Sequence, residues 1–193
     1  MNFGEIAVTD WHVDDDYATR MAELIESGQI DILDAINRSI SIRNISCLGV
    51  AYAFLIDTGE NFDTKLNVDW DVCIFFIKKY FQLCIEVNPD SQFADSRYSA
   101  CWDAARWISG EISAPRPSFL LGVDWVRPVF ENGDESVRLA IETGMLEHLP
   151  KTIGIGKLFI DWLDSGALQD ALSRSGLEEL AILAARSGGR GME

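Results

Sequence analysis

The stretch NVDWDVCIFFIKKYFQLCIEV, residues 67–87, decides the fold. Its apolar residues recur at helical spacing in two adjacent rows, which leaves one narrow polar stripe. The first row is Trp70, Cys73, Ile74, Ile77, Phe81, Cys84 and Ile85, the second is Val72, Phe76, Tyr80, Leu83 and Val87, and the stripe is Asp71, Lys78, Gln82 and Glu86. A helix that is apolar around so much of its circumference must be covered on most sides. The sequence therefore predicts a central helix with the other helices packed around it.

Helical patterns fill most of the remaining chain, and no long period-2 alternation indicates a sheet. We expect further helices at residues 14–27, 31–44, 45–57, 91–109, 135–149, 153–163, 167–173 and 177–186. The helix at 91–109 is expected to turn Phe93, Tyr98, Cys101, Trp102, Ala105 and Ile108 inward. Residues 119–130 predict a short helix that ends near Val126, or a kinked one, because the residue before Pro128 avoids helical geometry. The whole pattern predicts an all-α protein of about 8–10 helices.

The chain of 193 residues can bury a sizeable core and suits a single domain, 1–193, with two small, tightly joined domains as the alternative. Its clearest break is ISAPRPS, residues 112–118, which holds two prolines in three residues. We interpret this segment as a short connector between halves at 1–111 and 118–187. The last residues, 188–193, are expected to form a disordered tail.

An acid, a Ser or Thr, and a Gly recur in this order at four places along the chain. They are Glu26-Ser27-Gly28, Asp57-Thr58-Gly59, Glu142-Thr143-Gly144 and Asp164-Ser165-Gly166. Such a triplet is typical of a helix that ends on a left-handed Gly before the next helix begins. These junctions resemble the helix boundaries of HEAT and armadillo repeats, and the resemblance implies stacked helical hairpins. It covers only the junctions and carries over no binding residues.

The chain carries 31 acidic and 16 basic residues, which gives a formal net charge of −15. The excess lies at the two ends, with −9 over residues 1–70, −1 over 71–130 and −5 over 131–193. Such a charge repels nucleic acid and anionic membranes and attracts basic proteins. A purely solubilising role for the acidic residues stays open as the alternative.

The N-terminus is acidic and lacks the positively charged lead and apolar run of a secretory signal. No stretch reaches the roughly 20 apolar residues of a transmembrane helix. The cysteines Cys47, Cys73, Cys84 and Cys101 form no C-x-x-C pair and lie within expected helices. We therefore expect buried, reduced thiols and a cytoplasmic protein that binds neither membrane nor nucleic acid.

No motif predicts catalysis. His12 precedes Asp14, Asp15 and Asp16, but adjacent helical positions point in different directions, and helix capping is the simpler role for these acids. The sequence GIGK at 154–157 lacks the preceding strand and the following Ser or Thr of a phosphate-binding loop. We predict no enzyme, no cofactor and no metal site.

Negative charge without catalytic motifs favours a module that neutralises or masks a basic protein. Bacterial immunity proteins that neutralise nuclease toxins act in this way, as do phage inhibitors that mimic the charge of DNA. The predicted partner-binding residues are Asp14, Asp15, Asp16, Glu23, Asp31, Asp34, Trp125 and Arg127. Core packing of Trp125 is the alternative to an interface role. Two other functions stay open: a helical adaptor that binds a peptide or another copy of itself, and an enzyme with a carboxylate-lined helical pocket.

Overall fold

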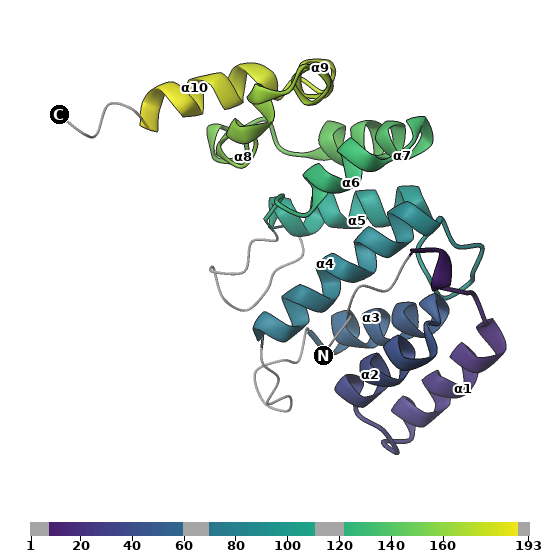
Figure 1. Cartoon of the computed structure of the whole chain (residues 1–193). Helices are drawn as coiled ribbons and strands as arrows, with labels where there is room; N and C mark the ends of the chain where they lie inside the picture. Colours follow the sequence, from purple (N-terminus) through teal and green to yellow (C-terminus); the bar gives the residue numbers. More distant parts are fainter. Residues whose placement is uncertain (1–7, 60–69, 111–121, 189–193) are drawn as a thin grey trace. The chain divides into compact units, whose positions relative to one another are not determined.

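The computed structural model describes residues 8–59, 70–110 and 122–188. In these ranges the secondary structure is helical, with ten α-helices, and the extended backbone is limited to one isolated bridge between His12 and Asn44 (Figure 1). The all-α prediction is therefore confirmed. The chain divides into two compact units, Met1–Ala100 and Cys101–Glu193. The predicted single domain and its halves stay predictions, and both the connector 112–118 and residues 189–193 lie outside the described residues.

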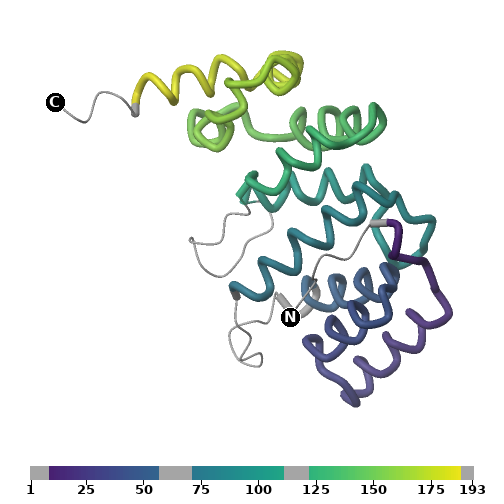
Figure 2. The backbone as a smooth tube through the Cα atoms, in the orientation of Figure 1, coloured from purple at the N-terminus to yellow at the C-terminus, as the bar shows by residue number. Residues whose placement is uncertain are grey.

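The first unit opens with a helical hairpin. A short 3-10 turn, η1 (Val8–Asp10), precedes α1 (Asp15–Glu26) and α2 (Ile32–Ile42), which lie side by side and pack on α3 (Ile45–Gly59) (Figure 2). The side chains of Asp14 and Asp31 accept the backbone N–H groups of Tyr17 and Asp34 and so cap the two helices. These local signals explain why both helices begin where the sequence predicts.

Helix α4 (Trp70–Val87) is the buried helix that the sequence predicts, although residues 67–69 lie outside the described residues. Its buried side chains are Cys73, Phe76, Ile77, Tyr80, Phe81, Leu83, Cys84 and Ile85. The ring of Tyr52 from α3 packs against it, 4.8 Å from the ring of Tyr80 and 5.2 Å from that of Phe81. Large aromatic surfaces thus join α3 to α4 in the core of the first unit.

The loop at residues 88–96 is tied to three helices of the first unit. The Ser91 hydroxyl donates to the Asp15 carboxylate of α1 at 2.7 Å and lies 3.1 Å from the Ser46 hydroxyl of α3. The Tyr80 hydroxyl of α4 donates to the Asp95 carboxylate at 3.0 Å and accepts the Asp95 N–H at 2.9 Å. The loop therefore links α1, α3 and α4, and we call residues 88–96 the clasp loop.

The predicted helix at 91–109 is shorter than expected, because the clasp loop takes its first six residues. Helix α5 spans Arg97–Ser109 and begins where the Ser96 hydroxyl accepts the Ser99 N–H. The orientation predicted for Tyr98 and Trp102 is wrong, since each is 50% exposed. The buried side of the helix is instead rich in alanine, which lets neighbouring segments approach closely: Ala100, Cys101, Ala104, Ala105, Trp107 and Ile108.

The second unit begins within α5, at Cys101, and continues, over the described residues, with five further α-helices. They are α6 (Val126–Asn132), α7 (Glu135–Ala140), α8 (Ile153–Lys157), α9 (Gly166–Arg174) and α10 (Glu178–Gly188). Between α7 and α8 lie a π-helical turn, η2 (Ile141–Met145), and a 3-10 turn, η3 (Leu146–His148); a second 3-10 turn, η4 (Ile160–Asp164), precedes α9. The aromatic core of the second unit includes Phe159, whose ring packs edge to face against that of Trp162, with the ring centroids 5.2 Å apart.

Two helix predictions in the second unit are wrong. Helix α6 begins at Val126 instead of ending there, and Pro128 falls in its first turn, where a missing backbone N–H costs nothing. The helix expected at 153–163 breaks after α8, because Gly154 and Gly156 give this five-residue helix a weak intrinsic propensity. Single-residue signals mislead here because they do not fix the position within a helix.

The sequence predicts that the four triplets of an acid, a Ser or Thr, and a Gly end helices on a left-handed Gly, and this prediction is confirmed only in part. Gly28 follows α1 with a positive φ of +69°, the left-handed conformation that the triplet predicts. Gly59 is the last residue of α3, Gly144 lies inside the π-helical turn, and Gly166 is the first residue of α9. The interpretation of Gly144 and Gly166 as left-handed helix ends is therefore wrong.

None of the helices in the described ranges combines the length and apolar character needed to cross a bilayer.

Candidate functional site

The three acids at the start of α1 serve different purposes. Asp14 caps the helix, and Asp15 binds the clasp loop through the Ser91 hydroxyl at 2.7 Å and the Gln92 N–H at 3.0 Å. Asp16 is exposed and makes no hydrogen bond or ion pair with any residue that the structure describes. Two of these three predicted contact residues thus stabilise the fold.

Asp15 lies in an environment that favours its charged form. Partial burial raises its pKa, but the hydrogen bonds from the Gln92 N–H and the Ser91 and Ser46 hydroxyls outweigh burial and lower the pKa below the ordinary value. Because the folded-state pKa is lowered, Asp15 contributes stability that is present above the unfolded-state pKa of about 3.9. That contribution is lost as the pH falls through the folded-state pKa.

We expect Asp15→Ala to lower the free energy of unfolding by about 1 kcal/mol at neutral pH, because the clasp loop loses its carboxylate partner. The difference from the wild type should shrink as the pH falls below the unfolded-state pKa of about 3.9 and through the lowered folded-state pKa. Urea unfolding followed by circular dichroism at several pH values measures both effects. Asp16→Ala removes the neighbouring exposed acid and serves as the control. Equal losses in the two variants, or a loss that does not depend on pH, would contradict this role for Asp15.

A second acidic group lies at the opposite end of α1, around the turn into α2. We call Glu23, Glu26, Asp31 and Asp34 the hairpin acids. Asp31 caps α2 by accepting the Asp34 N–H at 2.7 Å. The carboxylates of the other three are exposed and form no hydrogen bond or ion pair with the described residues. The charges of these three carboxylates are therefore not paired with any described residue.

The structure does not bring the six predicted acids together. Asp16 and Glu23 are about 10 Å apart along α1, whereas Asp14 and Glu26, at the two ends of the helix, are about 18 Å apart. Glu26 belongs with Glu23 and Asp34, although the predicted set omits it. The signal that could have identified it is its position at the end of α1, two residues before Gly28.

Trp125 and Arg127, the other predicted contact residues, are engaged within the second unit. Trp125 is 8% exposed and lies in the core. The Arg127 guanidinium donates to the Glu131 carboxylate at 3.0 Å and to the Asp161 carbonyl at 2.8 Å. The hydrogen bond to Glu131 is the main cause of a raised Arg127 pKa. Neither side chain presents the exposed anchor that the interface interpretation requires.

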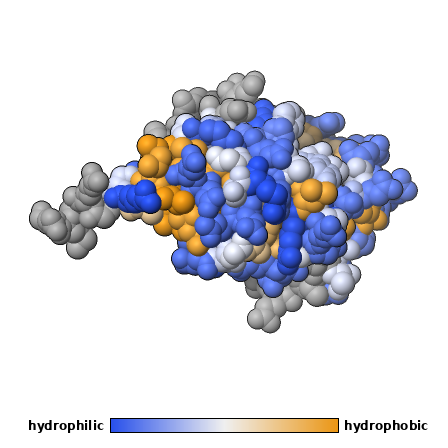
Figure 3. Space-filling view, turned by 90° about the horizontal axis from the view of Figure 1, so that it is seen from above, coloured by the Kyte–Doolittle hydropathy of each residue, from blue (hydrophilic) through white to orange (hydrophobic). Residues whose placement is uncertain are grey.

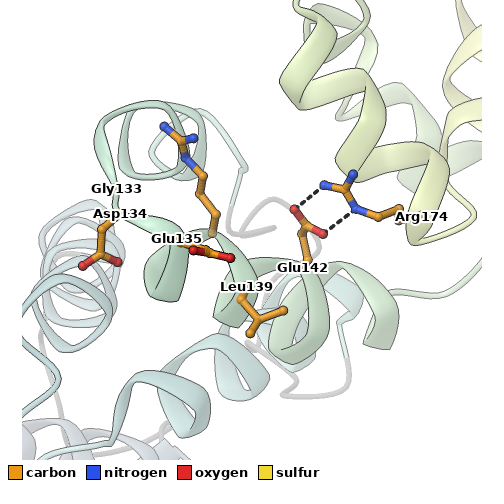
Figure 4. A pocket seen from close by; sticks show the side chains of 7 residues that line it. Gly133, Asp134, Glu135, Leu139, Glu142 and Arg174 are labelled. Carbon is orange, nitrogen blue, oxygen red and sulfur yellow. Dashed lines mark hydrogen bonds and ion pairs between the residues drawn. The ribbon is translucent and has the colours of Figure 1, made fainter.

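One pocket of the second unit, of about 660 Å³, lies beside α7 and the end of α9 (Figure 4). Its lining residues are Gly133, Asp134, Glu135, Arg138, Leu139, Glu142 and Arg174. The Arg174 guanidinium binds both carboxylate oxygens of Glu142, at 2.8 and 2.6 Å. This ion pair joins α9 to the π-helical turn, which explains why Glu142 is turned toward α9.

The remaining polar groups of the pocket are also largely engaged. Arg138 donates to the carbonyls of Phe130 and Glu131 at the end of α6, both at 3.0 Å. Asp134 caps α7 by accepting the Val137 N–H. Only the Glu135 carboxylate makes no hydrogen bond or ion pair with residues in the described ranges. A single uncommitted carboxylate gives no support to the enzyme alternative, which requires convergent catalytic groups.

The cysteines lie in the core, whereas both histidine side chains are exposed. All four cysteines are buried and not disulfide-bonded. Burial, reinforced by the charges of Asp14 and Asp15, raises the pKa of the Cys47 thiol to about 12, so it stays protonated. The backbone of His12 pairs with Arg43 and Ile45. In the part of the chain that the structure describes, His, Cys, Asp and Glu side chains form no group that could hold a metal ion.

Comparisons with protein-family models, with curated proteins and with solved structures find no match to this chain.

Proposed function

We propose that the protein is an acidic binding module that docks on a basic partner protein through the hairpin acids. The observation that carries the proposal is the set of three exposed carboxylates, Glu23, Glu26 and Asp34, that form no hydrogen bond or ion pair with the described residues. Uncompensated charge on a fixed helical hairpin attracts an opposite charge and accelerates association. Asp31 supports the surface indirectly, because it caps α2.

The partner is a protein with a strongly basic surface, such as a nuclease or another nucleic-acid-binding protein. The net charge of −15 opposes direct binding to nucleic acid, so the acids would occupy the surface that nucleic acid otherwise contacts. The protein would then neutralise its partner by covering that surface, as an immunity protein or a charge-mimicking phage inhibitor does. A helical adaptor is the alternative, and the exposed Tyr98 and Trp102 favour it, since such residues anchor protein interfaces.

The test compares two variants that lose the same number of acids. Glu23→Gln, Glu26→Gln and Asp34→Asn are combined in the hairpin variant, and Glu135→Gln, Asp164→Asn and Asp170→Asn are combined in the control. Each immobilised protein is incubated with extract of its host cells, and retained proteins are quantified by mass spectrometry. We expect the wild type and the control to retain the same basic proteins, and the hairpin variant to lose them.

Retention should also weaken as salt rises from about 50 to 300 mM, because ions screen exposed charges. Equal retention by all three proteins, retention that salt does not affect, or a retained set without basic proteins would each contradict the proposal. Circular dichroism of both variants verifies that the substitutions leave the helices intact.

A further inference from the structure

The last helix, α10, presents a stripe whose two ends carry opposite charges. Glu179, Ile182, Leu183 and Arg186 recur at intervals of three or four residues and share one side of the helix. Leu183 is 48% exposed, Ile182 is partly exposed, and both charged residues are exposed. Figure 3 shows apolar surface gathered over this end of the second unit. We call these four residues the α10 stripe.

The opposite side of α10 packs against the core of the second unit. Leu177, Ala181 and Ala184 are buried, and Gly156 of α8 packs directly against the backbone of Leu180 and Ala181. The α10 stripe therefore belongs to a helix with a fixed orientation in its unit. A fixed apolar side chain loses little conformational entropy on binding, which favours its use in an interface.

The charges of the stripe are not used within the described part of the chain. Neither Glu179 nor Arg186 forms a hydrogen bond or an ion pair with the residues described by the structure. The helix dipole favours an acid in the first turn and a base in the last turn. It gives no reason for a half-exposed Leu183 between them.

We propose that a second copy of this chain docks on the α10 stripe, with the two helices antiparallel about a twofold axis. Glu179 and Arg186 lie equally far from the midpoint between Ile182 and Leu183. An axis through that midpoint sets Glu179 of each copy opposite Arg186 of the other, and Leu183 of each copy opposite Ile182 of the other. The stripe is thus complementary to itself in both charge and hydrophobicity, as a twofold interface requires.

The self-association is weak and depends on protein concentration. One helical face buries less area than the interfaces of stable dimers, and each copy carries a net charge of −15. Dissociation constants of order 100 μM are the appropriate range for such a contact. Salt of about 150 mM screens the general repulsion between the copies.

Sedimentation equilibrium at concentrations up to about 1 mM, well above that range, tests the apolar part of the contact. The mass of the wild type should rise from 21.5 kDa toward twice that value. Leu183→Glu should keep the monomer mass throughout. Leu139→Glu is the matched control, because Leu139 is 50% exposed on another helix of the same unit, and it should behave as the wild type does. A wild type that stays monomeric, or equal behaviour of the two variants, would overturn the proposal.

Charge reversal tests the antiparallel pairing without depending on the apolar contact. Glu179→Arg and Arg186→Glu, each alone, set like charges opposite each other and should weaken self-association at least about fivefold. An equimolar mixture of the two single variants restores both attractive pairs and should recover the dimer. Failure of the mixture to associate better than either variant alone would exclude this geometry. The hairpin acids are untouched in these variants, so the outcome is independent of the proposed binding to a basic partner.

Discussion

Gly49→Ala is expected to destabilise the first unit by about 3 kcal/mol, because no room exists for a methyl group. A Cβ atom at this position would lie 2.1 Å from the carbonyl oxygen of Phe93 and 2.8 Å from the Cα of Ala94. Both atoms are backbone atoms of the clasp loop. The loop cannot retreat without breaking the hydrogen bonds that Asp15 and Tyr80 make to it.

Chemical unfolding and hydrogen exchange measure this effect together. The unfolding midpoint should fall, and exchange should accelerate most in α3 and in the loop at 88–96, where the packing is forced apart. Ala53→Ser, which adds one heavy atom at an exposed position of the same helix, is the control and should leave both measurements nearly unchanged. An unchanged midpoint for Gly49→Ala would show that the clasp loop is not packed against α3 in this way.

Gly156→Ala is expected to have a comparable effect in the second unit, again about 3 kcal/mol. Its Cβ would lie 2.5 Å from the carbonyl carbon and 2.6 Å from the carbonyl oxygen of Leu180. Helix α8 crosses α10 at this point, so the added methyl group must push two helical backbones apart.

Gly154→Ala provides a matched control two residues away in the same helix. Its Cβ would meet only the Thr152 hydroxyl, at 3.7 Å, and alanine favours helix more than glycine does. We therefore expect Gly154→Ala to be neutral or slightly stabilising in thermal unfolding, while Gly156→Ala melts at a lower temperature. Similar melting temperatures for the two variants would contradict the close crossing of α8 and α10.

Features that depend on local sequence could be predicted well. The caps Asp14 and Asp31 and the left-handed Gly28 act over three or four residues, so the sequence alone reveals α1 and α2. The apolar rows of α4 are a property of one segment, and that helix is buried as predicted. Local patterns therefore fix the fold class and most helix positions.

Features that depend on distant partners could not be predicted. The Ser91 hydroxyl donates to Asp15, which lies 76 positions earlier in the chain. This hydrogen bond holds Ser91 in a loop, and α5 begins only at Arg97. The exposure of Tyr98 and Trp102 follows from that new start and from the alanines that face inward. The residues that surround Ser91 in the sequence give no indication that its hydroxyl binds Asp15.

The candidate site was predicted in composition but not in geometry. Acid counts direct attention to the first 70 residues, but they do not separate acids that cap helices from acids that remain uncommitted. Glu26 could have been added from its position beside Gly28 at the end of α1. The division of the acids between the two ends of α1 requires the three-dimensional structure.

The distribution of electrostatic potential over the surface shows whether uncommitted negative charge is concentrated at the hairpin acids. Paramagnetic relaxation of the backbone amides, measured by NMR with a cationic and with an anionic nitroxide probe, reports the local potential at each residue. We expect the cationic probe to be enriched most strongly around residues 23–34. Equal enrichment along the exposed surfaces of both units would contradict this expectation.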